Sequence, residues 1–142
     1  MSQEISPQKA LIYLMVLVSA ADADMTDAEL LTIGEIVRKF PVFHGFDVDS
    51  LVSVAEECGE LLAREEYGVE TIVDIVRECL PERLYETAYA CAVEVAAADE
   101  AVDQEELRVL EVIRDTLRLS RLHSGAIEWS ARARHMTLEP RS

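Results

Sequence analysis

The sequence predicts an all-α fold, a compact single-domain bundle of about seven helices with an internal pseudo-twofold duplication. Apolar residues recur at steps of three and four almost throughout, whereas the alternation typical of strands never persists. An eight-residue acidic pattern occurs twice, 77 residues apart, and each copy follows an alanine-rich apolar run. With 142 residues, 50% of them hydrophobic, the chain is long enough to bury one core but too short for two. We therefore treat residues 1–142 as one domain, with a core from about 7 to 134.

Two helices are expected before residue 41. The first starts at Ser6-Pro7, because proline is favoured at the first helical position, and it runs to about residue 21. Its apolar residues lie on every side, which is typical of a central helix. The second starts after Thr26, which can form a capping box with Glu29, and it ends near residue 40.

Five further helices are expected after a loop at residues 42–49. Asp47 or Asp49 can cap the third, which continues to about residue 66, and Gly68 separates it from a short fourth helix that ends before residue 80. The fifth, over about 81–98, contains the second apolar run, and its small side chains should let it pack closely against the first helix. The sixth starts at a second capping box and reaches about residue 117. The last spans about 120–134, and the tail at 135–142 is expected to be frayed.

The composition narrows the functional classes. Twenty-eight acidic and thirteen basic residues give a formal charge of −15, which would repel nucleic-acid phosphates and anionic lipids. Three isolated cysteines lack the spacing of a zinc site or a disulfide framework. The sequence starts with no recognisable targeting segment, and its longest apolar run is shorter than the roughly 20 residues of a membrane span. We expect a cytoplasmic protein without nucleic-acid binding or membrane insertion.

The two copies of the acidic pattern form the candidate site. Aligned without gaps, residues 18–36 and 95–113 share seven identities, including Asp22 with Asp99 and Glu29 with Glu106. Helix capping alone is an adequate explanation of the two glutamates, because glutamate at the third helical position closes a capping box. The two aspartates each follow an apolar helix, where the negative end of the helix dipole disfavours an acid. The aspartates therefore carry most of the functional argument.

A metal ion would explain the four carboxylates together. If the repeats pack about a pseudo-twofold axis, Asp22, Glu29, Asp99 and Glu106 can converge, and they would repel one another unless a cation lay among them. A hard divalent ion such as calcium, magnesium or manganese suits such an all-oxygen site. The four could equally form two separate half-sites. They do not form an EF-hand, because residues 27 and 33 are not the required glycine and glutamate.

Each copy has the same order of features: an alanine-rich helix ending in Ala-Asp, a short turn, an apolar residue, a capping residue and a glutamate. In this order, residues 21–29 and 98–106 resemble the TerB tellurite-resistance family, and the resemblance covers about 7–119. It implies a compact seven-helix domain, a metal site built from the motif aspartates and glutamates, and a role in resistance to tellurite and other stresses. Tellurite is an oxyanion, so a chain at −15 would act through a metal ion or a protein partner.

Two other regions and one buried acid are candidates for interaction. The loop at 40–46 holds three phenylalanines that either form an exposed contact patch or seal one end of the core. The last helix is the only basic region, and it could dock an acidic partner or a neighbouring subunit, or simply balance its own acids such as Glu128. Glu94, within the apolar fifth helix, is expected to pair with an arginine or face outward, with metal ligation the less favoured role.

The leading hypothesis is a non-enzymatic module that binds a divalent metal ion through the four motif carboxylates and acts with a stress-response partner. The alternative is a metal-free protein–protein interaction domain that uses the aromatic loop at 40–46 or the basic last helix, with a homo-oligomer as one form of partnership. A metal-dependent hydrolase ranks third, because the sequence contains no nucleophile elbow, phosphate loop or zinc-protease motif.

Overall fold

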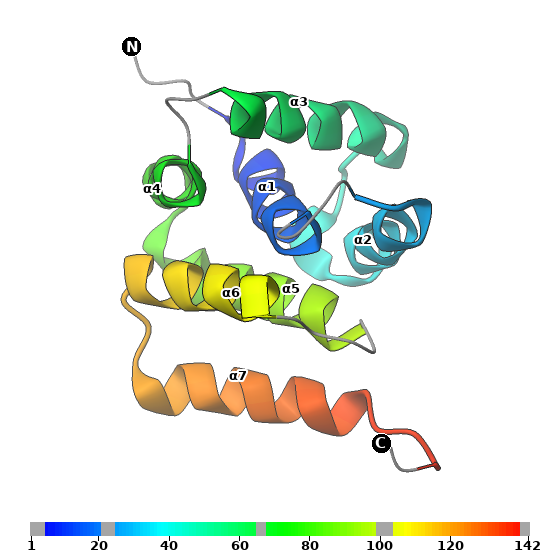
Figure 1. Cartoon of the computed structure of the whole chain (residues 1–142), viewed down its shortest axis with the longest axis vertical. Helices are drawn as coiled ribbons and strands as arrows, with labels where there is room; N and C mark the ends of the chain where they lie inside the picture. Colours follow the sequence, from blue (N-terminus) through cyan, green and yellow to red (C-terminus); the bar gives the residue numbers. More distant parts are fainter. Residues whose placement is uncertain (1–4, 21–24, 65–67, 99–103, 140–142) are drawn as a thin grey trace.

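The fold is all α, as predicted. The computed structural model describes residues 5–20, 25–64, 68–98 and 104–139. No strand occurs in these ranges. The helices are α1 (Pro7–Ser19), α2 (Asp27–Lys39), α3 (Leu51–Ala63), α4 (Val69–Cys79), α5 (Tyr85–Ala98), α6 (Gln104–Thr116) and α7 (Arg121–Arg134) (Figure 1). Short 3-10 turns at Pro41–Phe43, Val48–Ser50 and Glu82–Leu84 precede α3 and α5, so the predicted fifth helix becomes α-helical only at Tyr85.

Helix α1 lies at the centre, with α2, α3, α4, α5 and α6 packed around it (Figure 1). Every residue from 10 to 19 is buried, which agrees with the prediction of a central helix. Ser6 caps its start by accepting a hydrogen bond from the Lys9 amide at 3.1 Å. The side chain of Gln8 donates to the carbonyls of Val42 and His44, both at 3.1 Å, and this ties the loop at 40–46 to α1.

Helices α1 and α5 pack against each other, as predicted. The contact suits the small side chains on α5, where Ala88, Cys91, Ala92 and Ala96 are buried. Helices α2 and α6, which follow the two acidic patterns, each contact both members of this pair. The arrangement therefore brings parts of both sequence repeats to the same region of the molecule.

The phenylalanines of the loop at 40–46 close one end of the core. Phe43 is buried, and its ring meets that of Phe46 edge-on, with centroids 6.3 Å apart. Phe40 and Phe46 are partly buried against the same core. The interpretation of these rings as a seal is confirmed, and they do not form an exposed aromatic patch.

Helix α7 lies at the edge of the molecule and packs on α5 (Figure 1). Ser120 caps it by accepting from the His123 amide at 3.0 Å. At its other end, Glu94 of α5 accepts hydrogen bonds from Arg134 and, at 2.8 Å, from His135. The expected pairing of Glu94 with an arginine is confirmed, and the contact also holds the first residue of the tail that was expected to be frayed.

None of the helices in the described ranges combines the length and the apolar character that a membrane crossing needs.

Candidate functional site

One cavity lies where the two repeats meet. It is open to solvent on one side, has a volume of about 320 Å³, and is lined by the C-terminal ends of α1 and α5, the first two turns of α2 and the first turn of α6. Its lining residues are Ser19, Thr26, Ala28, Glu29, Thr32, Val95, Ala98 and Glu106. Two of the four predicted ligands, Glu29 and Glu106, are therefore brought to the same cavity.

Glu29 is held by the capping box predicted from the sequence. The Thr26 amide donates to Glu29 Oε1 at 2.8 Å, and the Glu29 amide donates to Thr26 Oγ1 at 3.1 Å. These two bonds satisfy backbone donors at the start of α2 that would otherwise be unpaired. Oε2 of Glu29 makes no hydrogen bond to a described residue, so one carboxylate oxygen is not used by the cap.

Glu106 is almost fully buried, with 4% of its surface exposed. A carboxylate is costly to bury unless nearby groups compensate its charge. Its position in the first turn of α6 supplies part of that compensation, because the positive end of the helix dipole lies there. The third helical position thus explains why a carboxylate is tolerated at Glu106. The structure places this side chain in the wall of the cavity.

Ser19 is a polar residue of the cavity that the sequence interpretation missed. It is 2% exposed, and its Oγ is buried without a hydrogen-bond partner in the described part of the chain. A buried hydroxyl left unpaired costs about 1–3 kcal/mol. A serine at the end of a long apolar run, where the second repeat has Ala96, was the signal that could have identified it.

The other two predicted ligands, Asp22 and Asp99, lie outside the described residues. Within the described ranges, no group of three or more histidine, cysteine, aspartate or glutamate side chains is placed to hold a metal ion. The convergence of all four carboxylates therefore stays a prediction.

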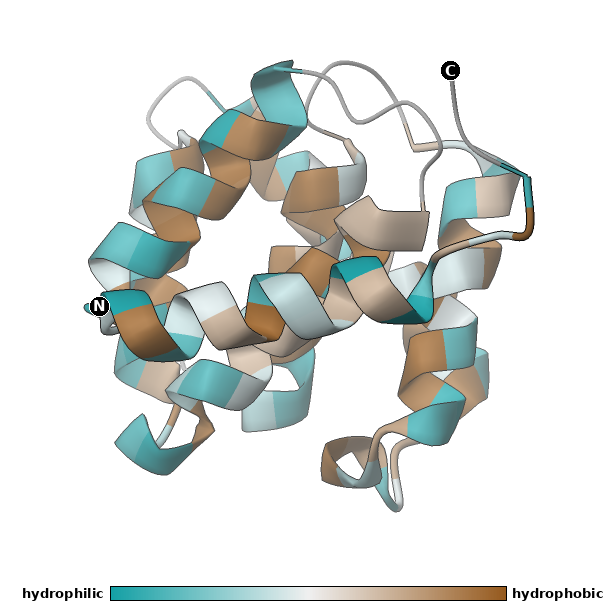
Figure 2. Cartoon of the chain, turned by 90° about the horizontal axis from the view of Figure 1, so that it is seen from below, coloured by the Kyte–Doolittle hydropathy of each residue, from teal (hydrophilic) through white to brown (hydrophobic). Residues whose placement is uncertain are grey.

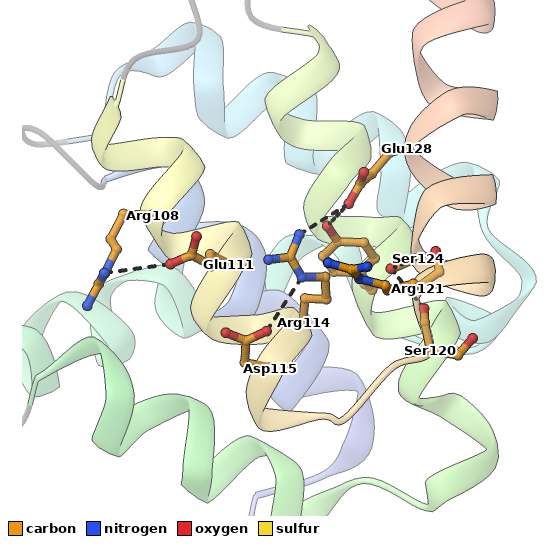
Figure 3. Close-up of polar contacts among 9 residues, drawn as sticks. Arg108, Glu111, Arg114, Asp115, Ser120, Arg121, Ser124 and Glu128 are labelled. Atoms are coloured by element: carbon orange, nitrogen blue, oxygen red, sulfur yellow. Dashed lines mark hydrogen bonds and ion pairs between the residues drawn. The ribbon is translucent and has the colours of Figure 1, made fainter.

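A second polar cluster joins α5, α6 and α7 (Figure 3). Tyr89 donates a hydrogen bond to Glu128, and Arg114 lies 3.8 Å from the same carboxylate. Burial raises the pKa of Tyr89, and the hydrogen bond to Glu128 raises it further. A cavity of about 460 Å³ beside this cluster is lined by Arg114, Arg121, Asp115 and Glu128 among others. Because Arg114 and the carboxylates of Asp115 and Glu128 offset one another there, we assign the cluster to the attachment of α7.

The chain was compared with protein families, curated proteins and solved structures. A family model described as tellurite resistance protein TerB matches residues 8–128, which is most of the chain. No curated protein and no solved structure matches it. The matched range includes both acidic patterns and all four walls of the 320 Å³ cavity.

Proposed function

We propose, because this chain belongs to the TerB family of tellurite resistance proteins, that it is a non-enzymatic module that binds a divalent cation. The proposed ligands are Asp22, Glu29, Asp99 and Glu106, and the resistance role would run through a protein partner. One observation carries the proposal: Glu29 and Glu106, one from each repeat, line the same cavity.

The donors around the cavity suit a hard cation. Glu29 and Glu106 offer carboxylate oxygens, and Ser19 offers a neutral hydroxyl oxygen that has no partner in the described chain. Calcium, magnesium and manganese all prefer oxygen ligands, and none of the described side chains that line this cavity offers a nitrogen or sulfur donor. A bound cation would neutralise the carboxylates and lower the cost of placing them together.

Helix capping is the competing explanation, and one substitution separates the two. Glutamine can replace glutamate in a capping box, because its side-chain oxygen accepts the same amide hydrogen bond. Glu29→Gln should therefore preserve the cap while removing a charge that a cation needs. If Glu29 serves only as a cap, this variant should bind metal ions as the unmodified protein does.

Calorimetric titration with calcium, magnesium and manganese ions, together with thermal melting, tests the proposal. We expect at least one ion to bind, and at 100 times its Kd to stabilise the fold by about 2.7 kcal/mol. Glu29→Gln, Glu106→Gln and the double variant Asp22→Ala/Asp99→Ala should each bind more weakly. Glu105→Gln is the matched control, because Glu105 is an exposed neighbour of Glu106 on the same helix. Its substitution changes the net charge by the same amount as Glu106→Gln does.

Two outcomes would overturn the proposal. A melting temperature that responds neither to a chelator nor to any of the three ions would favour a metal-free interaction domain. Binding that is unchanged in the Asp22→Ala/Asp99→Ala variant would place the ion elsewhere on this acidic surface.

A further inference from the structure

The outer face of α7 carries a continuous apolar stripe. Ser124 and Ala131 are buried on the inner face, towards α5. On the opposite face, the stripe residues follow steps of four and three, the spacing of a helix–helix seam. We call these residues the α7 stripe: Leu122, Ala126, Trp129, Ala133 and, just beyond the helix end, Met136. All five are exposed, Leu122 by 76% and Trp129 by 68%. Figure 2 views the molecule from the side on which α7 lies.

The clustering distinguishes this stripe from the other exposed apolar residues. Leu31, Val52 and Leu107 are also large and exposed, but each lies on a different helix. Single exposed apolar side chains are ordinary on a protein surface, whereas contiguous ones mark interaction sites. The remaining members of this class in the described chain, Leu122, Trp129, Met136 and Leu138, all lie within residues 122–138.

The charge around the stripe is opposite to that of the rest of the chain. Residues 118–142 contain five arginines and two glutamates, whereas residues 1–117 contain eight basic and 26 acidic residues. At 3.6 residues per turn, Arg121 and Arg132 project from the same edge of the stripe. Arg132 lies over the Trp129 ring, 4.8 Å from its centroid, in a cation–π contact.

The basic side chains on the two edges of the stripe differ in whether they form ion pairs within the chain. On one edge, His123 and Arg134 are bound to Glu86 and Glu94 of α5. On the other edge, no carboxylate of the described residues lies within ion-pair distance of Arg121 or Arg132. This edge therefore presents two arginines available to an external anion.

We propose that the α7 stripe docks an acidic amphipathic helix of another protein. The apolar face of such a helix would cover Leu122 and Trp129, and its carboxylates would pair with Arg121 and Arg132. The α7 stripe lies away from the 320 Å³ cavity, so docking does not depend on metal binding. An acidic helix of this kind would be the partner through which the chain acts.

The charges argue against a second copy or a lipid surface as the occupant. Two stripes placed face to face would bring the arginines of both copies into one interface, where like charges repel. A stripe placed on the acidic body of a second copy would leave that copy's own stripe uncovered and would form an open-ended chain. An anionic membrane extends beyond the stripe and would also face the acidic remainder of a chain with a net charge of −15, whereas a single helix covers the stripe alone.

A synthetic helical peptide without tryptophan tests the proposal on the full chain. It carries leucines at steps of four and three and glutamates on both flanks, and its control has lysine at every glutamate position. Trp129 is the only tryptophan in the chain and belongs to the stripe, so its emission reports docking directly. We expect the acidic peptide to shift this emission to the blue, to protect it from acrylamide and to bind more weakly as salt rises.

Variants locate the binding site through the anisotropy of a dye-labelled acidic peptide. Leu122→Ala and Arg132→Glu should each weaken binding about tenfold or more, the loss expected for an interface residue that contributes strongly. Leu31→Ala is the matched control, because it removes from α2 a leucine that is 67% exposed, close to the 76% of Leu122, and it should bind as the unmodified chain does. Glu106→Gln should also bind normally, which separates this site from the cavity.

Several results would overturn the proposal. The first is equal binding of the acidic and basic peptides, or no binding of either. The second is an effect of Leu31→Ala as large as that of Leu122→Ala. Self-association that Leu122→Ala abolishes would assign the stripe to a second copy, and binding to phosphatidylglycerol vesicles but not to the peptide would assign it to lipid.

Discussion

The attachment of α7 should depend on Glu94 far more than on Glu86, although both carboxylates lie on α5 and each binds one end of α7. The Glu94 side chain is 18% exposed and has two partners, Arg134 and His135. The Glu86 side chain is 55% exposed and, among the described residues, forms an ion pair with His123 alone, at 2.8 Å. The two substitutions Glu94→Gln and Glu86→Gln therefore form a matched pair.

The magnitudes follow from burial. Removing one partner of a fully buried ion pair costs about 3–5 kcal/mol, because the remaining charge is left uncompensated. Arg134 is half exposed, so water compensates part of the loss, and we expect Glu94→Gln to lower the free energy of unfolding by about 1–2 kcal/mol. Glu86→Gln removes a solvated contact and should change it by no more than about 0.5 kcal/mol.

Urea unfolding followed by two probes measures both effects. Far-UV circular dichroism reports all helices, whereas the anisotropy of Trp129 reports α7 alone, because the chain has no other tryptophan. In Glu94→Gln the anisotropy should fall at a lower urea concentration than the circular dichroism does. Equal losses in the two variants, or an unchanged stability of Glu94→Gln, would refute the reasoning from burial.

Three further predictions concern pH, the cavity and the thiols. Burial acts to raise the pKa of Glu94, but its hydrogen bonds and ion pairs with α7 outweigh it and hold the pKa below the ordinary value. The stabilisation by ionised Glu94 is therefore present above the pKa of this carboxyl in the unfolded chain, and it is lost as pH falls through its pKa in the folded protein. The free energy of unfolding of Glu94→Gln should accordingly depend less on pH in the acid range than that of the unmodified protein. Ser19→Ala removes an unpaired buried hydroxyl. In the presence of a chelator, it should therefore raise the free energy of unfolding by about 1 kcal/mol and the melting temperature by about 3 °C. A loss of stability would show that the hydroxyl has a partner. Burial raises the pKa of the Cys58 and Cys91 thiols to about 12, so a thiol reagent should modify these two only when the protein unfolds. The partly exposed Cys79 should react first, in the native protein. Rapid reaction of all three thiols in the native protein would contradict this.

Local sequence signals were sufficient to predict the helices. Caps and turn residues act within a few positions of the chain, so Ser6, Thr26 and Ser120 start helices where the sequence indicated. Apolar residues on every side of a helix leave no face for water, and α1 is accordingly central. The start of α5 was predicted too early, because the 3-10 turn at Glu82–Leu84 carries the same kinds of residues as a helical turn.

The candidate site was only partly predictable. The repeated pattern identified Glu29 and Glu106 as residues of interest, because both copies place an acid at the same helical position. The contribution of Ser19 was missed, since a serine in an apolar run has no distinctive pattern of its own. Its importance depends on which groups face its hydroxyl, and these come from other helices.

By itself, the sequence determined the fold class, the family resemblance, the central position of α1 and the cap at Thr26, because each depends on neighbours along the chain. Only the tertiary structure decided that Glu29 and Glu106 share a cavity and that α7 keeps an uncovered apolar stripe around Trp129. The physical reason is that helices pack through long-range contacts. An apolar spacing of four and three shows that a helix has a face to bury, but only the packed molecule shows whether that face is already covered.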